Sequence, residues 1–93
     1  MKVMAVGTLT PLTPEQRLEI LPKEVPATLK IYLEDKMEQF WLREKEAGVI
    51  FLMNVDTAEA AGKILGELPL VKANLLKFEL LPIGPLLPLG MLL

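Results

Sequence analysis

Residues 49–53, VIFLM, form a run in which every side chain is apolar. A strand with one face in water alternates apolar and polar side chains, so an unbroken apolar strand needs protein against both faces. The preceding residues, 37–43, alternate instead, with one face made of Met37, Gln39, Trp41 and Arg43 and the other of Glu38, Phe40 and Leu42. Polar residues 44–48 separate the two segments. Together they predict a hairpin of two antiparallel strands.

A helix is expected before this hairpin, after a first strand over residues 2–10. Thr13 is placed as its N-cap, Pro14 at the first helical position, and Gln16 completes a capping box. Apolar residues at intervals of three and four then predict an amphipathic helix, namely Leu18, Leu21, Val25, Leu29, Tyr32 and Leu33. An interior proline removes a hydrogen bond and clashes with the preceding turn. Pro22 and Pro26 therefore predict two shorter helices that meet near residue 22, with the second ending near residue 35.

A further helix is expected after the hairpin, opened by Asp56 and Thr57, with Glu59 placed to complete a capping box with Asp56. Its buried stripe is predicted to be Ala61, Ile64, Leu65 and Leu68. Gly62 and Gly66 indicate either a close backbone contact or tolerance at an exposed surface. Pro69 is expected to end this helix, and residues 75–83 predict the last strand. The order βαββαβ predicts an α+β protein with a ferredoxin-like antiparallel sheet.

Hydrophobic residues make up 52% of this 93-residue chain, which has room for one domain, predicted over residues 1–83. A domain of this size buries only about two thirds of the surface of its unfolded chain. The apolar residues that one domain cannot bury predict a homodimer, in which two sheets pack face to face through the open face of each sheet. A higher oligomer is also compatible with this pattern. Residues 84–93, GPLLPLGMLL, are expected to form an apolar arm on the sheet or on the dimer partner.

Composition excludes several classes of function. The net charge of −2, with charges of both signs interspersed, lacks the basic surface that nucleic acid binding requires. No apolar segment is long enough to span a membrane or to form a signal peptide. The chain has no cysteine, so we expect a cytoplasmic protein, and no histidine, the commonest general base and metal ligand. We expect neither a cofactor nor a metal.

A family resemblance rests on the order of four features along the chain. They are a strand, a proline-containing helical segment, a hairpin with the pair FW, and the segment LPLVKANLLKFELLPIGP at residues 68–85. The chain resembles the small muconolactone isomerase-like proteins of the dimeric α+β barrel superfamily, a group related to the YciI-like proteins. The resemblance implies a homodimer whose sheets form an incomplete barrel, with a pocket between sheet and helices or between subunits. It also implies a small, often lactone or aromatic ligand, and no metal or organic cofactor.

The resemblance implies proton transfer at carbon, by which muconolactone isomerases move a double bond. Such chemistry needs a base and a hydrogen-bonding group, and without histidine the base must be a carboxylate, a lysine or a tyrosine. On the first hairpin strand, Trp41 is a candidate wall for a flat substrate, Gln39 a hydrogen-bonding group and Arg43 a catalytic clamp for a carboxylate. The alternatives are dimer-core packing for Trp41 and a solvated surface charge for Arg43.

Three further candidates lie elsewhere in the chain. Lys77 and Glu79 share a face of the last strand, where Glu79 is a candidate base and Lys77 a substrate-binding group. A cross-strand surface pair is the alternative for these two residues. Tyr32 is a candidate to offer its hydroxyl to the pocket, or else it is a packed tyrosine with its tip in water.

Two functions are open at this point. The first is a small cofactor-independent isomerase that acts by acid–base chemistry on a small lactone or aromatic-derived acid. The second is a non-catalytic homodimeric module that binds a small hydrophobic ligand or a partner protein. An enzyme is expected to bury a carboxylate with a raised pKa beside a donor, whereas a binding module keeps its charges outside the cavity.

Overall fold

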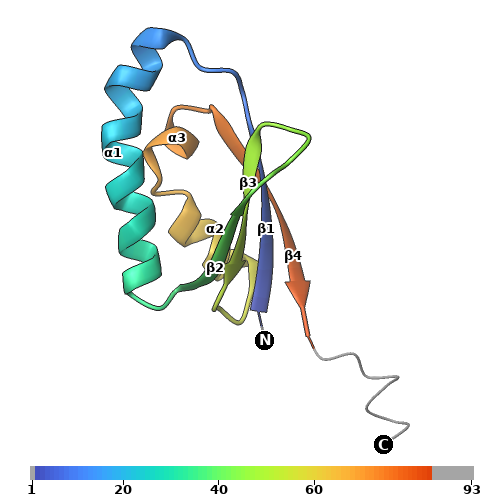
Figure 1. The fold of residues 1–93 in the computed structure, drawn as a ribbon. Helices are drawn as coiled ribbons and strands as arrows, with labels where there is room; N and C mark the ends of the chain where they lie inside the picture. The colour runs from blue at the N-terminus through green and yellow to red at the C-terminus, as the bar shows by residue number, and fades with distance from the viewer. Residues whose placement is uncertain (1, 85–93) are drawn as a thin grey trace, which may run out of the picture.

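The computed structural model describes residues 2–84, and the predicted arm beyond Gly84 lies outside them. Seven elements follow one another along the chain, namely β1 (Lys2–Leu9), α1 (Pro14–Leu33), β2 (Met37–Leu42), β3 (Gly48–Met53), α2 (Ala58–Leu65), α3 (Pro69–Lys72) and β4 (Leu76–Ile83) (Figure 1). The four strands form one antiparallel sheet in the order β2-β3-β1-β4. The predicted α+β class and ferredoxin-like topology are confirmed.

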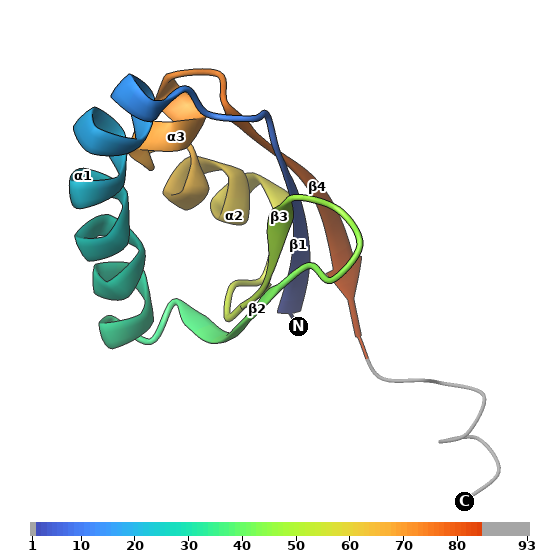
Figure 2. The ribbon, with the colours of Figure 1, turned by 45° about the horizontal axis from the view of Figure 1, so that its top comes forward.

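The three helices lie on the same side of the sheet, as Figure 2 shows most directly. Directly opposed residues share a face of a sheet, and Ala5 of β1 is opposed by Phe51 of β3 and Leu80 of β4. The main core forms where this face meets the helices, and its buried members are Val3, Ala5, Ile31, Met37, Phe51, Met53, Ala61, Leu65 and Leu68. No helix of residues 2–84 covers the opposite face, called here the open face.

Helix α1 begins as predicted. The Thr13 hydroxyl accepts a hydrogen bond from the backbone N–H of Gln16 at 3.1 Å, and the Gln16 side chain accepts one from the backbone N–H of Thr13 at 2.9 Å. The predicted break near Pro22 is wrong, because α1 runs without interruption through both Pro22 and Pro26. The two prolines are exposed, so water reaches the side of the helix on which backbone hydrogen bonds are lost.

The side of α1 that packs on the protein also differs from the predicted apolar stripe. Ile31 and Glu24 are buried, and Ala27 packs on the main core. In contrast, Leu18 and Leu33 are 81% and 69% exposed. The helix is therefore rotated relative to the orientation in which its leucines would all be buried.

The β2–β3 hairpin contains one irregularity that changes a predicted face. Met37 opposes Met53, but Gln39 opposes Leu52, which leaves Glu38 as an extra residue in a bulge. The buried Met37 consequently points to the helix side, and the prediction that it shares a face with Gln39 is wrong.

The second half of the chain shows two corrections. Thr57, not Asp56, is the N-cap of α2, and its hydroxyl accepts a hydrogen bond from the backbone N–H of Ala60 at 3.1 Å. Pro69 does not end a long helix; it opens the short helix α3, because α2 has already closed at Gly66. The predicted buried stripe is correct, since Ala61, Leu65 and Leu68 are buried and Ile64 packs against them. A Cβ placed on Gly62 would lie 3.4 Å from Leu80 Cδ1, so this glycine faces β4.

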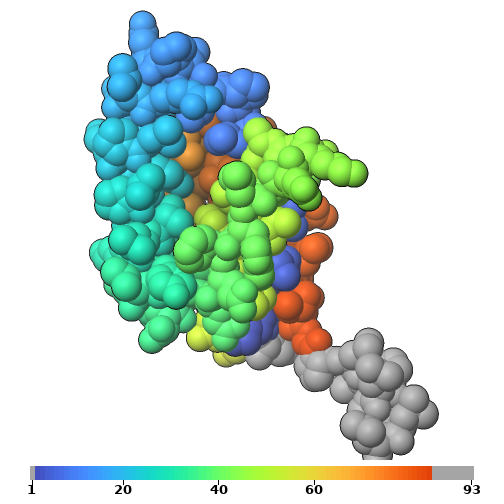
Figure 3. Space-filling view, in the orientation of Figure 1, coloured from blue at the N-terminus to red at the C-terminus, as the bar shows by residue number. Residues whose placement is uncertain are grey.

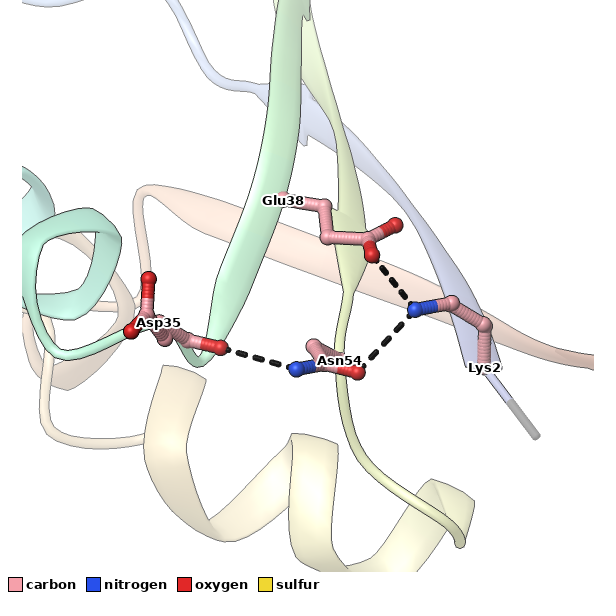
Figure 4. Close-up of polar contacts among 4 residues, drawn as sticks. All are labelled: Lys2, Asp35, Glu38 and Asn54. Atoms are coloured by element: carbon pink, nitrogen blue, oxygen red, sulfur yellow. Dashed lines mark hydrogen bonds and ion pairs between the residues drawn. The ribbon is translucent and has the colours of Figure 1, made fainter.

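A polar network at one end of the sheet joins segments that are distant in sequence (Figure 4). The Lys2 ammonium donates to the Glu38 carboxylate at 2.5 Å and to the Asn54 side-chain oxygen at 3.0 Å. The Asn54 amide in turn donates to the backbone carbonyl of Asp35 at 3.1 Å. The network fixes the start of β1 against the bulge of β2 and the turn that follows α1.

Candidate functional site

A cavity of about 470 Å³ lies between α1 and the helix side of the sheet. In the space-filling view, the surface is hollowed between α1 (blue to teal) and the β2–β3 hairpin (green), with orange atoms of the later chain behind (Figure 3). The lining residues are mostly apolar and are Leu9, Leu21, Glu24, Val25, Thr28, Leu29, Tyr32, Met37, Phe40, Trp41, Leu42, Gly48, Val49, Phe51, Leu70 and Leu76. This volume falls in the range of small-molecule binding sites.

Glu24 is the charged residue in this cavity, and only 7% of it is exposed. One carboxylate oxygen accepts a hydrogen bond from the backbone N–H of Leu70 at 2.9 Å, and the other accepts one from the Thr28 hydroxyl at 3.5 Å. Burial raises the pKa of the Glu24 carboxyl above its usual value, and these two hydrogen bonds offset only part of that effect. The result is a carboxyl group held in place in an apolar cavity and more basic than one in water.

The polar groups of the cavity come from one side of α1. Glu24, Thr28 and Tyr32 are spaced by four residues, which places them above one another on a helix. The Tyr32 ring meets the Phe40 ring edge to face, with 5.3 Å between the ring centroids and an interplanar angle of 86°. The continuous helix thus presents a carboxyl and two hydroxyl groups in a row against the apolar wall of the sheet.

Two of the candidates predicted from the sequence border this cavity. Tyr32 lies on α1 and lines it. Trp41 also borders the cavity, but it opposes Ile50 rather than Phe51, so its side chain lies on the open face and is 44% exposed. The predicted pair of Tyr32 and Trp41 is therefore divided between the two faces of the sheet.

The other four candidates lie away from the cavity, on the open face or beside it. Gln39 opposes Leu52 on β3, Lys77 opposes Thr8 on β1, and Glu79 opposes Val6 on β1. Gln39, Lys77 and Glu79 are exposed in the single chain. The structure gathers these residues on one face but does not bring them to the buried carboxyl.

Arg43 makes three contacts at the end of the hairpin. Its guanidinium donates to the Thr8 hydroxyl at 2.9 Å and to the Gly7 carbonyl at 3.4 Å, and it forms an ion pair with Glu46 at 2.5 Å. These contacts join the hairpin turn to β1. The guanidinium is directed toward these partners and not into the cavity, whose lining does not include Arg43.

Sequence reasoning missed Glu24, although a signal was present. Glu24 follows Leu21 by three residues and precedes Thr28 by four, which is the spacing of a single helix face. A break assumed at Pro22 placed Leu21 and Glu24 on separate helices and removed this relation. A continuous helix would have shown a glutamate on the side that faces the sheet.

Two features are absent from the described part of the chain, residues 2–84. No helix there is long and apolar enough to cross a membrane. No group of three or more acidic side chains in the same range is arranged to hold a metal ion.

Comparison with known proteins relates this arrangement to solved structures. Neither a protein-family model nor a curated protein sequence matches the chain. The structure of muconolactone isomerase is similar with a TM-score of 0.75 and 17% identity, over 91% of this chain and 90% of that one. The 5-chloro-2-hydroxyhydroquinone dehydrochlorinase of Burkholderia phenoliruptrix AC1100, in complex with 2,5-dihydroxybenzoquinone, is similar with a TM-score of 0.69 and 12% identity, over 90% of this chain and 94% of that one. The chain therefore shares its fold with these two proteins, and the resemblance to the muconolactone isomerase-like proteins is confirmed at the level of the fold.

Proposed function

We propose that the protein is a cofactor-independent enzyme that moves a proton at carbon in a small cyclic carbonyl compound, with Glu24 as the base. The observation that carries this proposal is the buried Glu24 carboxyl, which lies beside the Thr28 hydroxyl in an otherwise apolar cavity. A base works best when its pKa is close to the operating pH, and burial shifts Glu24 in that direction. Two similar structures belong to an isomerase and a dehydrochlorinase that act on small cyclic compounds, which supports the same class of substrate here.

The proposed step is a double-bond migration in an unsaturated lactone. The Glu24 carboxylate takes a proton from the saturated ring carbon next to the C=C bond that is conjugated with the lactone carbonyl, and the electron pair of that C–H bond enters a dienolate. The protonated carboxyl then returns a proton to the carbon next to the carbonyl, and the double bond shifts by one position. No atom is gained or lost overall, and Glu24 ends the cycle in its original ionisation state.

Other groups of the cavity have supporting roles in this proposal. The Thr28 hydroxyl donates its proton to Glu24 and orients the base. Tyr32 lies in the same row of α1, and its hydroxyl can donate a hydrogen bond to the oxygen that becomes negative in the dienolate. Apolar side chains exclude water, which strengthens these hydrogen bonds. Tyr32 remains a candidate for contact with the substrate ring at the border of the cavity, whereas the Trp41 side chain lies on the open face.

We also propose that a second copy of the chain covers the open face. Apolar side chains on three strands make up much of this face and are Met4, Val6, Ile50, Leu52 and Leu81. A contiguous apolar surface of this kind is typical of an interface. In such a dimer, Gln39, Lys77 and Glu79 would lie at or near the contact between the two sheets.

The dimer is tested by sedimentation velocity on two variants that carry the same substitution. Leu52→Glu places a charge on a central strand of the open face and is expected to give a monomer. Leu18→Glu places the same charge on the exposed side of α1, where Leu18 is 81% exposed, and is expected to leave the dimer intact. A monomeric parent protein, or equal behaviour of the two variants, would contradict the proposed interface.

The catalytic proposal is tested by NMR in D₂O with the methyl ester of muconolactone. The protein is expected to accelerate both deuterium incorporation at the ring and migration of the double bond. Glu24→Gln removes the base but keeps a side-chain oxygen to accept from Leu70, so both rates are expected to fall to background. Glu19→Gln, an exposed change on the same helix, serves as the control. Binding without exchange by the parent protein would instead favour a non-catalytic ligand-binding module.

A further inference from the structure

The charge arrangement of the cavity points to a narrower substrate class. We propose that the cavity accepts uncharged cyclic carbonyl compounds and rejects those that carry a free carboxylate. This inference rests on the proposed function, because it concerns the substrate of the same cavity. It differs from the expectation that the ligand is a lactone or aromatic-derived acid held by an arginine.

Among residues 2–84, no cationic side chain lines the cavity to receive a carboxylate. The lining residues include no lysine and no arginine, whereas Glu24 places a carboxyl group among them. A buried charge is tolerated only when it is paired or well solvated by hydrogen bonds. An anionic ligand would lose its hydration, find no opposite charge and meet the Glu24 carboxylate at short range.

Arg43, the predicted carboxylate clamp, is already engaged elsewhere. Its guanidinium is shared between Thr8, the Gly7 carbonyl and Glu46. To reach a ligand in the cavity, it would have to leave these partners, including an ion pair. The observed contacts assign Arg43 to the attachment of the hairpin turn.

The sequence that follows the described residues adds no cationic side chain. This segment, residues 85–93, is PLLPLGMLL and contains no lysine, arginine or histidine. No side chain in this segment is able to supply the missing positive charge to the cavity.

The dimensions of the cavity suit one or two rings. Successive residues of a helix rise by about 1.5 Å, so the row from Glu24 to Tyr32 spans roughly 12 Å. A volume of about 470 Å³ accommodates a small lactone or quinone together with a short substituent. The Tyr32 hydroxyl offers a donor to a carbonyl oxygen, which a neutral lactone or ester has and which needs no counter-charge.

The test compares two ligands that differ only in charge, muconolactone and its methyl ester, by ligand-observed NMR and calorimetry at pH 7. We expect the ester to bind at least about tenfold more tightly than the acid. Equal or tighter binding of the acid would overturn the inference. Failure of both ligands to bind at millimolar concentration would also overturn it, because the cavity would then not hold lactones.

Two variants test the electrostatic reason directly. Val25 borders the cavity and is 64% exposed, so Val25→Lys can supply a cation at its edge, and we expect the preference for the ester to shrink severalfold. Leu18→Lys adds the same charge on α1 away from the cavity lining and is expected to leave the preference unchanged. A preference that is equal in both variants would show that charge in the cavity does not select the ligand.

Failure of this inference is distinguishable from failure of the proposed function. If the ester binds in preference to the acid but no deuterium is incorporated, the charge selection stands and the catalytic proposal fails. If both compounds bind equally and both undergo exchange that depends on Glu24, the catalytic proposal stands and the charge selection fails.

Discussion

Replacement of Glu24 by glutamine is expected to raise the stability of the protein relative to that of the parent chain as the pH rises. The folded protein holds the proton of this carboxyl more tightly than the unfolded chain does, because burial raises its pKa above its ordinary value of 4.5. Above pH 4.5, the unfolded chain releases the proton first. The free energy of unfolding of the parent protein therefore loses a contribution as the pH rises through the folded-state pKa.

The magnitude follows from linkage between proton binding and folding. In the window where the folded state keeps the proton and the unfolded state has released it, stability falls by at most about 1.4 kcal/mol per pH unit. Glutamine has no proton to release, so this contribution is absent in Glu24→Gln. The stability of Glu24→Gln minus that of the parent should be constant below pH 4.5, rise through the window and become constant again above the folded-state pKa.

Urea denaturation of both proteins between pH 4 and pH 9, at fixed protein concentration, measures this difference. Glu19→Gln makes the same chemical change at an exposed position of α1 and reports the effect of removing one surface charge. The burial of Glu24 would be refuted if the free energy of unfolding of Glu24→Gln minus that of the parent did not change with pH. It would also be refuted if this difference fell as the pH rises. Glu24→Ala adds a second check, since it leaves the buried N–H of Leu70 without this acceptor at a cost of about 1–3 kcal/mol.

Three further substitutions have outcomes that the fold determines. Gly48→Ala should unfold the protein or destabilise it by several kcal/mol in thermal denaturation, because Gly48 has a φ of 153° and a Cβ there would lie 2.0 Å from the Gly7 carbonyl oxygen. Pro26→Ala should raise the free energy of unfolding by about 2 kcal/mol in urea, since alanine restores a helical N–H and outweighs the entropic benefit of proline in the unfolded chain. Lys2→Met should change it by less than about 1 kcal/mol, because the ion pair with Glu38 is well exposed to solvent.

The strands of the sheet were predictable from the sequence because each is marked by the pattern of apolar and polar residues within its own segment. The unbroken apolar run of β3 and the apolar β4 indicated that both faces need cover, and the structure shows helices on only one of them. Alternation in β2 placed Gln39 and Trp41 on one face correctly. The error at Met37 arose because a bulge adds one residue and reverses the alternation, and no residue type at Glu38 marks a bulge in the sequence.

The course of α1 was less predictable, because its stability comes from tertiary contacts and not from propensity. Two interior prolines favour a break, yet packing of Ile31 and Ala27 on the core and of Ile20 and Leu21 on a second cluster holds the helix together. The many leucines of α1 also led to a wrong prediction of which side of this helix is buried. Several leucines of α1 remain exposed, while a glutamate takes a buried position that local sequence rules assign to an apolar residue.

The two faces of the sheet have different roles in the proposed function, and this explains why strand patterns favoured a different carboxylate, Glu79, from the Glu24 that we propose. Glu79 shares the open face with the apolar residues that we assign to the dimer contact, so we assign Glu79 to the region of that contact. Glu24 lies on the helix side, where its carboxyl has a backbone partner and a cavity beside it. In the proposed function, assembly and proton transfer therefore depend on separate sets of side chains. A charge on the open face should separate the subunits without changing the ionisation of Glu24, and a change at Glu24 should alter proton transfer without separating the subunits.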